Sequence, residues 1–364
     1  EGWIDRALED LPSEKQIVER RTSGGGLTAP EFAVLMAYTK TSNIDVVGRS
    51  NLPDEPVLRR ELAQYFPVPL RERFDHLLDG HPLRCEIITT RLCNQMVNMS
   101  GITFDHRITE ETGIDVVEVT RAWVAARDIV DAEAAWDEIE SIQSAVRADV
   151  QIELLLEVRQ MIERTVLWLL RHGRPPLDIA AAVVEFREPV QRLASGLDDV
   201  LTGRMRDLTF AREAGRLAAG VPERLAQRSS QWPVVHTFLD IVRLAGRTGA
   251  PVAAVARTYW EMFEVVDAGW VWDAIGSMPR SDRWQTQARS ALRDDLLAVL
   301  ADLTEDVLGV GSVDAWTARN ERSLTRAAGL AAELRRSDAL ELTTLTVALR
   351  QLRNVVLSSP HDGR

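Results

Sequence analysis

Apolar residues recur at intervals of three and four positions along nearly the whole chain, and this spacing is typical of amphipathic helices that pack through one face. Alternating apolar and polar runs between turn residues, which would indicate strands, are missing from the sequence. The pattern therefore predicts an all-α protein, a multi-helix bundle. The predicted helices cover residues 30–40, 56–65, 68–80, 82–99, 115–130, 132–143, 148–172, 176–195, 197–220, 232–247, 250–267, 284–308, 313–335 and 337–357.

Two of the predicted helices begin with a capping-box sequence. Thr28 can accept a hydrogen bond from an unpaired backbone N–H of the first turn, and Glu31 can reach back to the N–H of Thr28. Asp115 and Glu118 repeat this spacing after Gly113, a residue suited to end the preceding helix. We therefore expect helix starts at both places.

An internal repeat is the clearest large-scale feature of the sequence. Residues 107–141 and 243–277 align without gaps at an offset of 136 positions. Its period is much longer than that of a solenoid unit. We expect an N-terminal extension or linker over residues 1–26, followed by two related helical sub-bundles, 27–172 and 173–364, which together form one helical domain. The shared identities include Arg107/Arg243, Gly113/Gly249, Val116/Val252, Val119/Val255, Arg121/Arg257, Val130-Asp131-Ala132/Val266-Asp267-Ala268, Trp136-Asp137/Trp272-Asp273, Ile139/Ile275 and Ser141/Ser277.

The repeat also predicts how each copy packs. Val116, Val119 and Trp123 fall on one helix face, and the second copy carries Val252, Val255 and Tyr259 at the same positions. Trp136 and Trp272 are expected to anchor the core, with ligand stacking as the alternative. Arg121 and Arg257 are expected to pair with Asp131 or Asp267, or else to be solvated surface charges.

Composition and charge narrow the class of protein. The 364 residues are 45% hydrophobic and 27% charged, the balance of a soluble globular protein. No stretch approaches the roughly 20 apolar residues that span a bilayer, so no membrane is expected as a partner. The net charge of −12 disfavours nucleic acid. Two cysteines cannot form a disulfide framework, which favours a reducing cytoplasm.

The start of the sequence and its glycine run support further expectations. The chain opens on the charged stretch after Glu1-Gly2-Trp3, without a basic and then apolar leader, so no signal peptide is expected. The missing initiator Met suggests a segment of a longer chain. Gly24-Gly25-Gly26 precedes a helix start, but no strand comes before it and no Gly-Lys-Ser/Thr follows, which favours a linker over a phosphate cradle.

Candidate chemistry concentrates in the stretch "HPLRCEIITTRLCNQMVNMSGITF", residues 81–104. His81 and Cys85 have the i, i+4 spacing of a metal-ligand pair, but Cys93 lies eight residues further, about 12 Å along a helix. Cys85 also shares an apolar stripe with Ile88 and Leu92, which favours a buried structural cysteine.

Other catalytic patterns are missing as well. The sequence has no HExxH, no G-x-S-x-G and no G-x-G-x-x-G after a strand. Carboxylate pairs such as Glu110-Glu111 and Asp198-Asp199 are typical of solvated helix ends in an acidic chain. We therefore assign no catalytic, cofactor-binding or metal-binding residue in this segment.

The other side of the helix over 82–99 is polar. Arg91, Asn94 or Gln95, and Asn98 lie there, and asparagine is a weak helix former, so helix propensity does not explain these amides. The functional interpretation is a polar surface on which another domain docks. The alternative is a solvated face.

Several blocks of the sequence resemble the C-terminal region of the large bacterial NAD-specific glutamate dehydrogenases. They occur in the same order as in that family and extend from about residue 4 to 172, and more weakly to about 357. The blocks are LTAPEFAVLMAYTK, SNLPDEP, YFPVPLRERF, HPLRCEI, VNMSGITF and RAWVAARDIVDAEAAWDEIE.

The resemblance implies a function for a longer chain. Such enzymes interconvert L-glutamate and 2-oxoglutarate plus ammonium, with NAD as the cofactor, and their catalytic modules precede this segment. It implies that this piece is a C-terminal helical domain with a structural, assembly or regulatory role, inactive alone and without a cofactor of its own. Its partners would be the catalytic domain of the same chain and further copies in a homo-oligomer.

Two other classes of function remain open from the residues alone. One is a free-standing helical module that binds a ligand or a protein. The other is a helical enzyme that uses buried carboxylates or a metal held by His and Cys.

Overall fold

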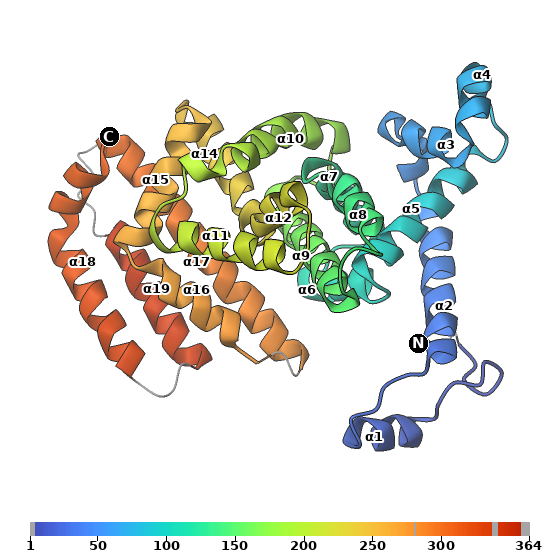
Figure 1. Ribbon diagram of the computed structural model, residues 1–364, viewed down its shortest axis with the longest axis horizontal. Helices are drawn as coiled ribbons and strands as arrows, with labels where there is room; N and C mark the ends of the chain where they lie inside the picture. Colours follow the sequence, from blue (N-terminus) through green and yellow to red (C-terminus); the bar gives the residue numbers. More distant parts are fainter. Residues whose placement is uncertain (1–3, 280–281, 337–340, 358–364) are drawn as a thin grey trace. The chain divides into compact units, whose positions relative to one another are not determined.

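Figure 1 shows a computed structural model, which describes residues 4–279, 282–336 and 341–357. All regular secondary structure in these ranges is helical, and no strand occurs among them. The predicted all-α class is confirmed. The chain divides into two compact units, one made of Glu1–Asp128 with Val158–Val183 and the other of Ile129–Glu157 with Val184–Arg364.

The first unit contains the N-terminal helices. Helix α9 (Ala148–His172) contributes its later part to this unit, and α10 (Ile179–Ser195) contributes its beginning. The complete elements are α1 (Glu14–Thr22), α2 (Ala29–Gly48), the 3-10 helices η1 (Leu52–Asp54) and η2 (Pro56–Leu58), α3 (Arg59–Tyr65), α4 (Val68–Leu78), α5 (Arg84–Ser100), α6 (Phe104–Thr112) and α7 (Val116–Ile129).

The second unit contains the remaining parts of α9 and α10 and the C-terminal helices. These are α8 (Ala132–Ser141), η3 (Leu197–Asp199), α11 (Gly203–Ala218), α12 (Glu223–Ser230), α13 (Trp232–Val235), α14 (Thr237–Thr248), α15 (Val252–Val265), α16 (Ala268–Ser277), α17 (Arg283–Val310), α18 (Val313–Arg336) and α19 (Leu342–Leu357). The expected sub-bundle boundary at residue 172 stays a prediction, although residues 129–157 group with the later helices.

The periodicity located most helices and missed four short ones. Helix α9 has the predicted bounds, whereas α1, α6, α12 and α16 were not among the predicted ranges. Helix α1 buries no residue, so it has no apolar period to detect. Helices α6, α12 and α16 are at most ten residues long, too short to show the period over several turns. The first residues of the predicted range 337–357 lie outside the described residues.

The two predicted helix starts have different outcomes. The capping box of α2 is confirmed, because the Thr28 hydroxyl accepts from the Glu31 N–H at 3.5 Å and Glu31 accepts from the Thr28 N–H at 2.7 Å. Asp115 accepts from the Glu118 N–H at 3.0 Å, but the Glu118 carboxylate accepts from the backbone N–H of Leu177 instead. The reciprocal half of that box is therefore wrong, since a distant segment provides a buried donor.

The two aligned segments adopt the same local structure. Helices α15 and α16 begin and end 136 positions after α7 and α8. Asp131 and Asp267, just before α8 and α16, both have left-handed backbones, with φ of 54° and 51°. Gly113 and Gly249 also match, with φ of 74° and 71°. Gly113 follows α6 as predicted.

The predicted helix face is buried, whereas the two tryptophans that were predicted to anchor the core are only partly buried. Val119 and Trp123, like Val255 and Tyr259, are fully buried. Trp136 is only half-buried, and its indole N–H donates to Glu140 on the same helix at 2.8 Å. Its repeat counterpart on α16 is half-buried too, so the prediction that these two tryptophans anchor the core is wrong. The fully buried tryptophans of the described chain are Trp123, Trp260 and Trp316.

Candidate functional site: a buried arginine–carboxylate network

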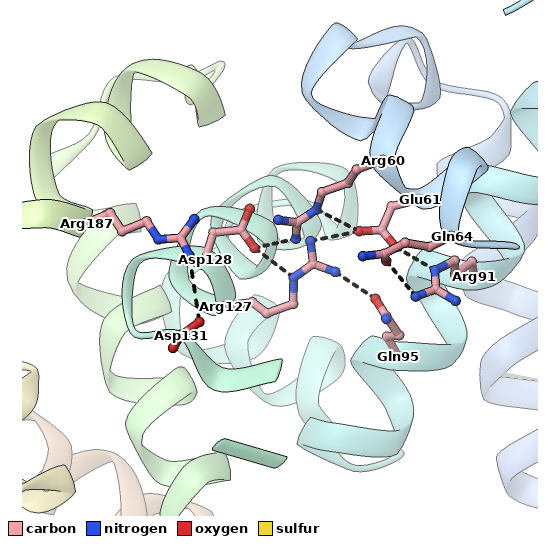
Figure 2. A network of polar contacts seen from close by, with 9 residues as sticks. All are labelled: Arg60, Glu61, Gln64, Arg91, Gln95, Arg127, Asp128, Asp131 and Arg187. Atoms are coloured by element: carbon pink, nitrogen blue, oxygen red, sulfur yellow. Dashed lines mark hydrogen bonds and ion pairs between the residues drawn. The ribbon is translucent and has the colours of Figure 1, made fainter. Parts of the chain in front are cut away.

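A network of charged side chains lies inside the first unit, between α3, α5 and α7 (Figure 2). Arg127 follows Trp123 by four positions, so both side chains fall on the same face of α7, and both are fully buried. The buried face of α7 therefore places the Arg127 guanidinium in the core. A buried charge is stable only when it is paired and hydrogen-bonded, so the neighbouring helices must provide partners.

Glu61 of α3 is the main partner. Its side chain is completely buried and forms an ion pair with Arg127, with Nη2 and Oε1 2.9 Å apart. Arg91 of α5 donates from Nε to the other carboxylate oxygen at 2.9 Å. Arg60 donates from Nε to Oε1 at 3.2 Å. One carboxylate thus contacts three guanidinium groups from three helices.

Two other nitrogen atoms of Arg127 donate hydrogen bonds within the same site, whereas Nη2 meets Glu61 as an ion pair without hydrogen-bond geometry. Its Nε donates to Asp128 at 3.0 Å, and its Nη1 donates to the amide oxygen of Gln95 on α5 at 2.7 Å. Its guanidinium carbon also lies 5.3 Å from the centre of the Trp123 ring, a cation–π contact. These contacts fix the side chain on several sides.

Two further contacts close the network. Arg60 donates to Asp128 as well as to Glu61, and therefore links the two carboxylates. Arg91 donates to the amide oxygen of Gln64 at 2.7 Å. Figure 2 shows these side chains converging from α3, α5 and α7.

The electrostatics of Glu61 reflect two opposing causes. Burial raises the pKa of the Glu61 carboxyl above its ordinary value, while Arg60 and Arg91 act to lower it. Removing one partner of such a site leaves an uncompensated charge in the interior, which typically costs about 3–5 kcal/mol. The arrangement therefore ties α3, α5 and α7 together in one geometry.

A second group of contacts surrounds Arg121, which precedes Arg127 by six positions on α7. Arg121 forms an ion pair with Glu55 and donates from Nη2 to Asn51 at 2.9 Å. It also lies 3.7 Å from Glu118, which accepts from the Leu177 N–H. Helix α7 is thereby tied to the segment before α3 and to the segment before α10.

The expected partners of the repeat arginines are therefore wrong. Arg121 is buried and paired with Glu55, while Asp131 pairs with Arg228 at 3.1 Å. Asp267 pairs with Arg335, and Arg257 is exposed. The sequence alignment matched these residues by position, but their partners come from segments that the repeat does not include.

The predicted docking face on α5 is largely occupied by the chain itself. Arg91 and Gln95 are bonded to α3 and α7 within the network. Asn98 is exposed and accepts from Lys40 of α2 at 2.8 Å. Asn94 is half-buried. This face is a contact between helices of the first unit rather than a surface for another domain, because α3 and α7 cover it.

The candidate metal pair has other contacts. His81 Nδ1 accepts from the Leu83 N–H at 3.1 Å, and Cys85 donates to Asp54 at 3.6 Å. Cys93 is fully buried, and burial raises the pKa of its thiol to about 12. Among the described residues, no group of three or more His, Cys, Asp or Glu side chains is arranged to hold a metal ion.

The glycine run shows the geometry of a turn. The Gly25 N–H donates to the Arg20 carbonyl at 2.7 Å, which closes the end of α1. Gly24 has a φ of 74°, in the left-handed region. Gly101, directly after α5, has a φ of 88° and ends that helix.

Sequence reasoning missed the centre of the network. Glu61 and Arg127 are 66 positions apart, and no local pattern links them. A signal was present in α7 alone, since Arg127 continues the face defined by Val119 and Trp123. A charged residue on an apolar face predicts a buried ion pair, but its partner can be found only in three dimensions.

Among the helices of the described ranges, none is both long and apolar enough to cross a bilayer.

Similarity to known proteins shows the family of this helical chain. The family model described as glutamate dehydrogenase, C-terminal, matches residues 24–354. The NAD-specific glutamate dehydrogenase of Mycobacterium tuberculosis is 34% identical over 99% of this chain, and that of Pseudomonas aeruginosa is also 34% identical over 99%. The enzyme of Halomonas elongata is 29% identical over 98%. The chain covers only 22–23% of the length of these relatives.

The fold and the buried network define an all-α domain whose helices are joined by internal ion pairs. The chain belongs to the family of glutamate dehydrogenase C-terminal regions, and it corresponds to the C-terminal region of the NAD-specific glutamate dehydrogenases.

Proposed function

We propose that this chain is the C-terminal helical domain of a longer NAD-dependent glutamate dehydrogenase. In that enzyme, L-glutamate, NAD⁺ and water would give 2-oxoglutarate, ammonium, NADH and a proton. The observation that carries the proposal is the match of 99% of this chain to 22% of a relative that bears this name.

Within such an enzyme, the domain would have a structural, assembly or regulatory role and no catalytic site of its own. The buried network supports this proposal, because Glu61, Arg91 and Arg127 join three helices by contacts whose loss would be costly. A rigid scaffold of this kind can hold a neighbouring module in position. The repeat at an offset of 136 would mark two related sub-bundles of the scaffold, residues 27–172 and 173–364.

The proposal includes the setting of the whole enzyme. NAD would bind in a part of the longer chain outside these residues, and the catalytic domain of the same chain would be the main partner. The enzyme would be a cytoplasmic homo-oligomer.

The test compares the longer dehydrogenase with a version that lacks the residues equivalent to 1–364. Glutamate-dependent NADH formation, sedimentation and the response to effectors are measured for both. We expect the deletion to impair at least one of these properties, and we expect the 364-residue chain alone to form no NADH. Full activity, assembly and effector response without the domain would contradict the proposal.

A binding measurement separates this proposal from that of a free-standing ligand-binding module. The 364-residue chain is titrated with NAD and with L-glutamate in a calorimeter. We expect no heat of binding from either compound. Saturable binding of either one with a stoichiometry near one would contradict the absence of a ligand site.

A further inference from the structure

Helix α4 exposes an apolar stripe. Leu70, Phe74 and Leu77 follow each other at i, i+4 and i+7, the spacing of one helix side, and α4 is kinked at Phe74, whose φ of −121° and ψ of 17° are not helical. Their exposed fractions are 47%, 37% and 57%. Scattered exposed leucines are common on proteins, but a continuous stripe on one helix marks an interaction surface.

The opposite side of α4 faces its own unit. Arg59 of α3 donates to Asp75 at 3.0 Å and to Asp79, just after α4, at 2.8 Å. The spacing places these two carboxylates on the other side of the helix from Leu70 and Leu77. Asp75 and Asp79 contact α3 while their side chains stay more than half exposed, and the apolar Leu78 is the buried residue of α4.

The helix has little burial to stabilise it. Leu78 is its only buried residue, and α3 is its main neighbour. Isolated helices shorter than about 12–15 residues are marginal in water, and α4 has 11. Packing of the exposed stripe against another surface would provide the missing stabilisation.

The surroundings of the stripe have the composition of an interface. Tyr65, three positions before α4, and Leu83, five positions after it, are exposed as well. The Arg73 guanidinium lies 5.1 Å from the centre of the Phe74 ring. Aromatic residues and arginine are enriched in the centres of protein interfaces.

The exposed apolar residues also concentrate near this part of the chain. In the described ranges, 12 of the 21 large apolar side chains that are exposed lie between Leu8 and Leu83. This span is about a fifth of the sequence, so the uncovered surface is not spread evenly.

We propose that the stripe of Leu70, Phe74 and Leu77 is the docking surface for another part of the same longer dehydrogenase chain. The proposal rests on the proposed function. More than three quarters of each relative has no counterpart in this chain, since the chain covers 22–23% of their length. That remainder is a protein surface available at a high effective concentration, because it is covalently linked.

The experiment measures amide hydrogen exchange of residues 68–78 in the longer dehydrogenase and in the 364-residue chain. We expect exchange at least about tenfold slower in the longer chain, because docking protects the helix. The double variant Leu70→Asp/Leu77→Asp in the longer chain should return exchange to the rate of the 364-residue chain. Both substituted side chains are exposed, so the variant should leave the melting temperature of the 364-residue chain unchanged.

Val184→Asp is the matched control, because Val184 is also an exposed apolar residue of a helix, with 82% of its surface accessible. It should leave the protection of α4 unchanged. Equal exchange in the two chains, or protection that survives the double variant, would overturn the proposal. So would self-association of the 364-residue chain that the double variant abolishes, because a second copy would then cover the stripe.

The outcome is separable from that of the proposed function. If deletion of the domain impairs the enzyme but α4 is unprotected in the longer chain, only the docking surface is wrong. If deletion has no effect on the enzyme, the proposed function is wrong, and the exchange of α4 still reports whether the stripe is covered.

Discussion

Glu61 and Arg127 form an ion pair with an oxygen–nitrogen distance of 2.9 Å, and both side chains are completely buried. The two residues come from α3 and α7, and Arg91 of α5 contacts the same carboxylate. A buried pair with additional hydrogen bonds gives less net stability than its Coulomb energy suggests, but it strongly penalises any arrangement that separates the partners. The pair therefore specifies how these three helices pack.

Replacement of Glu61 by alanine should destabilise the chain by about 3–5 kcal/mol, because three arginines would lose a shared carboxylate in the interior. Urea denaturation, followed by circular dichroism, measures the change. Glu185→Ala is the control, since this glutamate is exposed on α10, and its effect should stay within about 0.5 kcal/mol. A loss below about 1 kcal/mol for Glu61→Ala would show that the network adds little to the fold.

The two cysteines should differ in reactivity. Cys93 is fully buried, and burial raises the pKa of its thiol to about 12, so almost no thiolate is present near neutral pH. Cys85 is half-buried, and its pKa is raised mainly by burial and by nearby Asp54. A thiol reagent at pH 8 should therefore modify Cys85 slowly and leave Cys93 unmodified in the native chain.

Peptide mapping after labelling identifies the modified residue. Cys85→Ser should abolish native-state labelling, whereas Cys93→Ala should not change it. Rapid labelling of Cys93 under native conditions would mean that the core around α5 opens readily.

The junction of α1 and α2 should respond to acid. Hydrogen bonds from Arg20 and from the Thr28 N–H lower the pKa of the Glu31 carboxyl to about 2. Because the folded pKa lies below that of an unfolded chain, the pair stabilises the junction above the ordinary glutamate pKa. This contribution is lost as the pH falls through about 2.

NMR titration of the Glu31 side chain measures this pKa directly. Arg20→Ala should raise it toward the ordinary value, because the largest cause of the shift is removed. An unchanged pKa in the variant would assign the shift to the Thr28 cap alone.

Gly101 should tolerate alanine less well than Gly113. Gly101 has φ 88° and ψ 160°, a region essentially restricted to glycine, and a Cβ there would lie 3.1 Å from the Arg159 guanidinium. Gly113 has a φ of 74° with no atom within 4 Å of an added Cβ. We expect losses of about 2–3 kcal/mol for Gly101→Ala and about 1 kcal/mol for Gly113→Ala.

Denaturant unfolding of both variants tests this difference. Equal losses would show that neither the glycine-only backbone region of Gly101 nor the nearby Arg159 guanidinium adds to the cost.

The parts of the fold that depend on neighbouring residues were predictable. The helix period gave the bounds of α9, and the Thr28–Glu31 spacing gave the cap of α2. Hydrogen bonds and side-chain contacts within four positions produce both features, so the local sequence contains all the groups involved. The family blocks similarly indicated the family that the comparison with known proteins then established.

The candidate site was not predictable in the same way. The sequence placed Arg91 on the polar face of its helix, but it suggested a docking surface where the structure has an internal network. It also offered Asp131, Asp267 or solvent as the surroundings of Arg121, whereas the partner is Glu55. In both cases the charged residue was found and its partner was not.

By itself, the sequence determined that the chain is helical, where most helices begin and end, and to which family it belongs. Only the tertiary structure decided that Glu61 meets Arg127 and that the stripe of Leu70, Phe74 and Leu77 is left uncovered. The physical reason is the separation in sequence between the groups that interact. Helix formation follows from groups a few residues apart, whereas the pairing of buried charges and the coverage of apolar faces depend on segments brought together by folding.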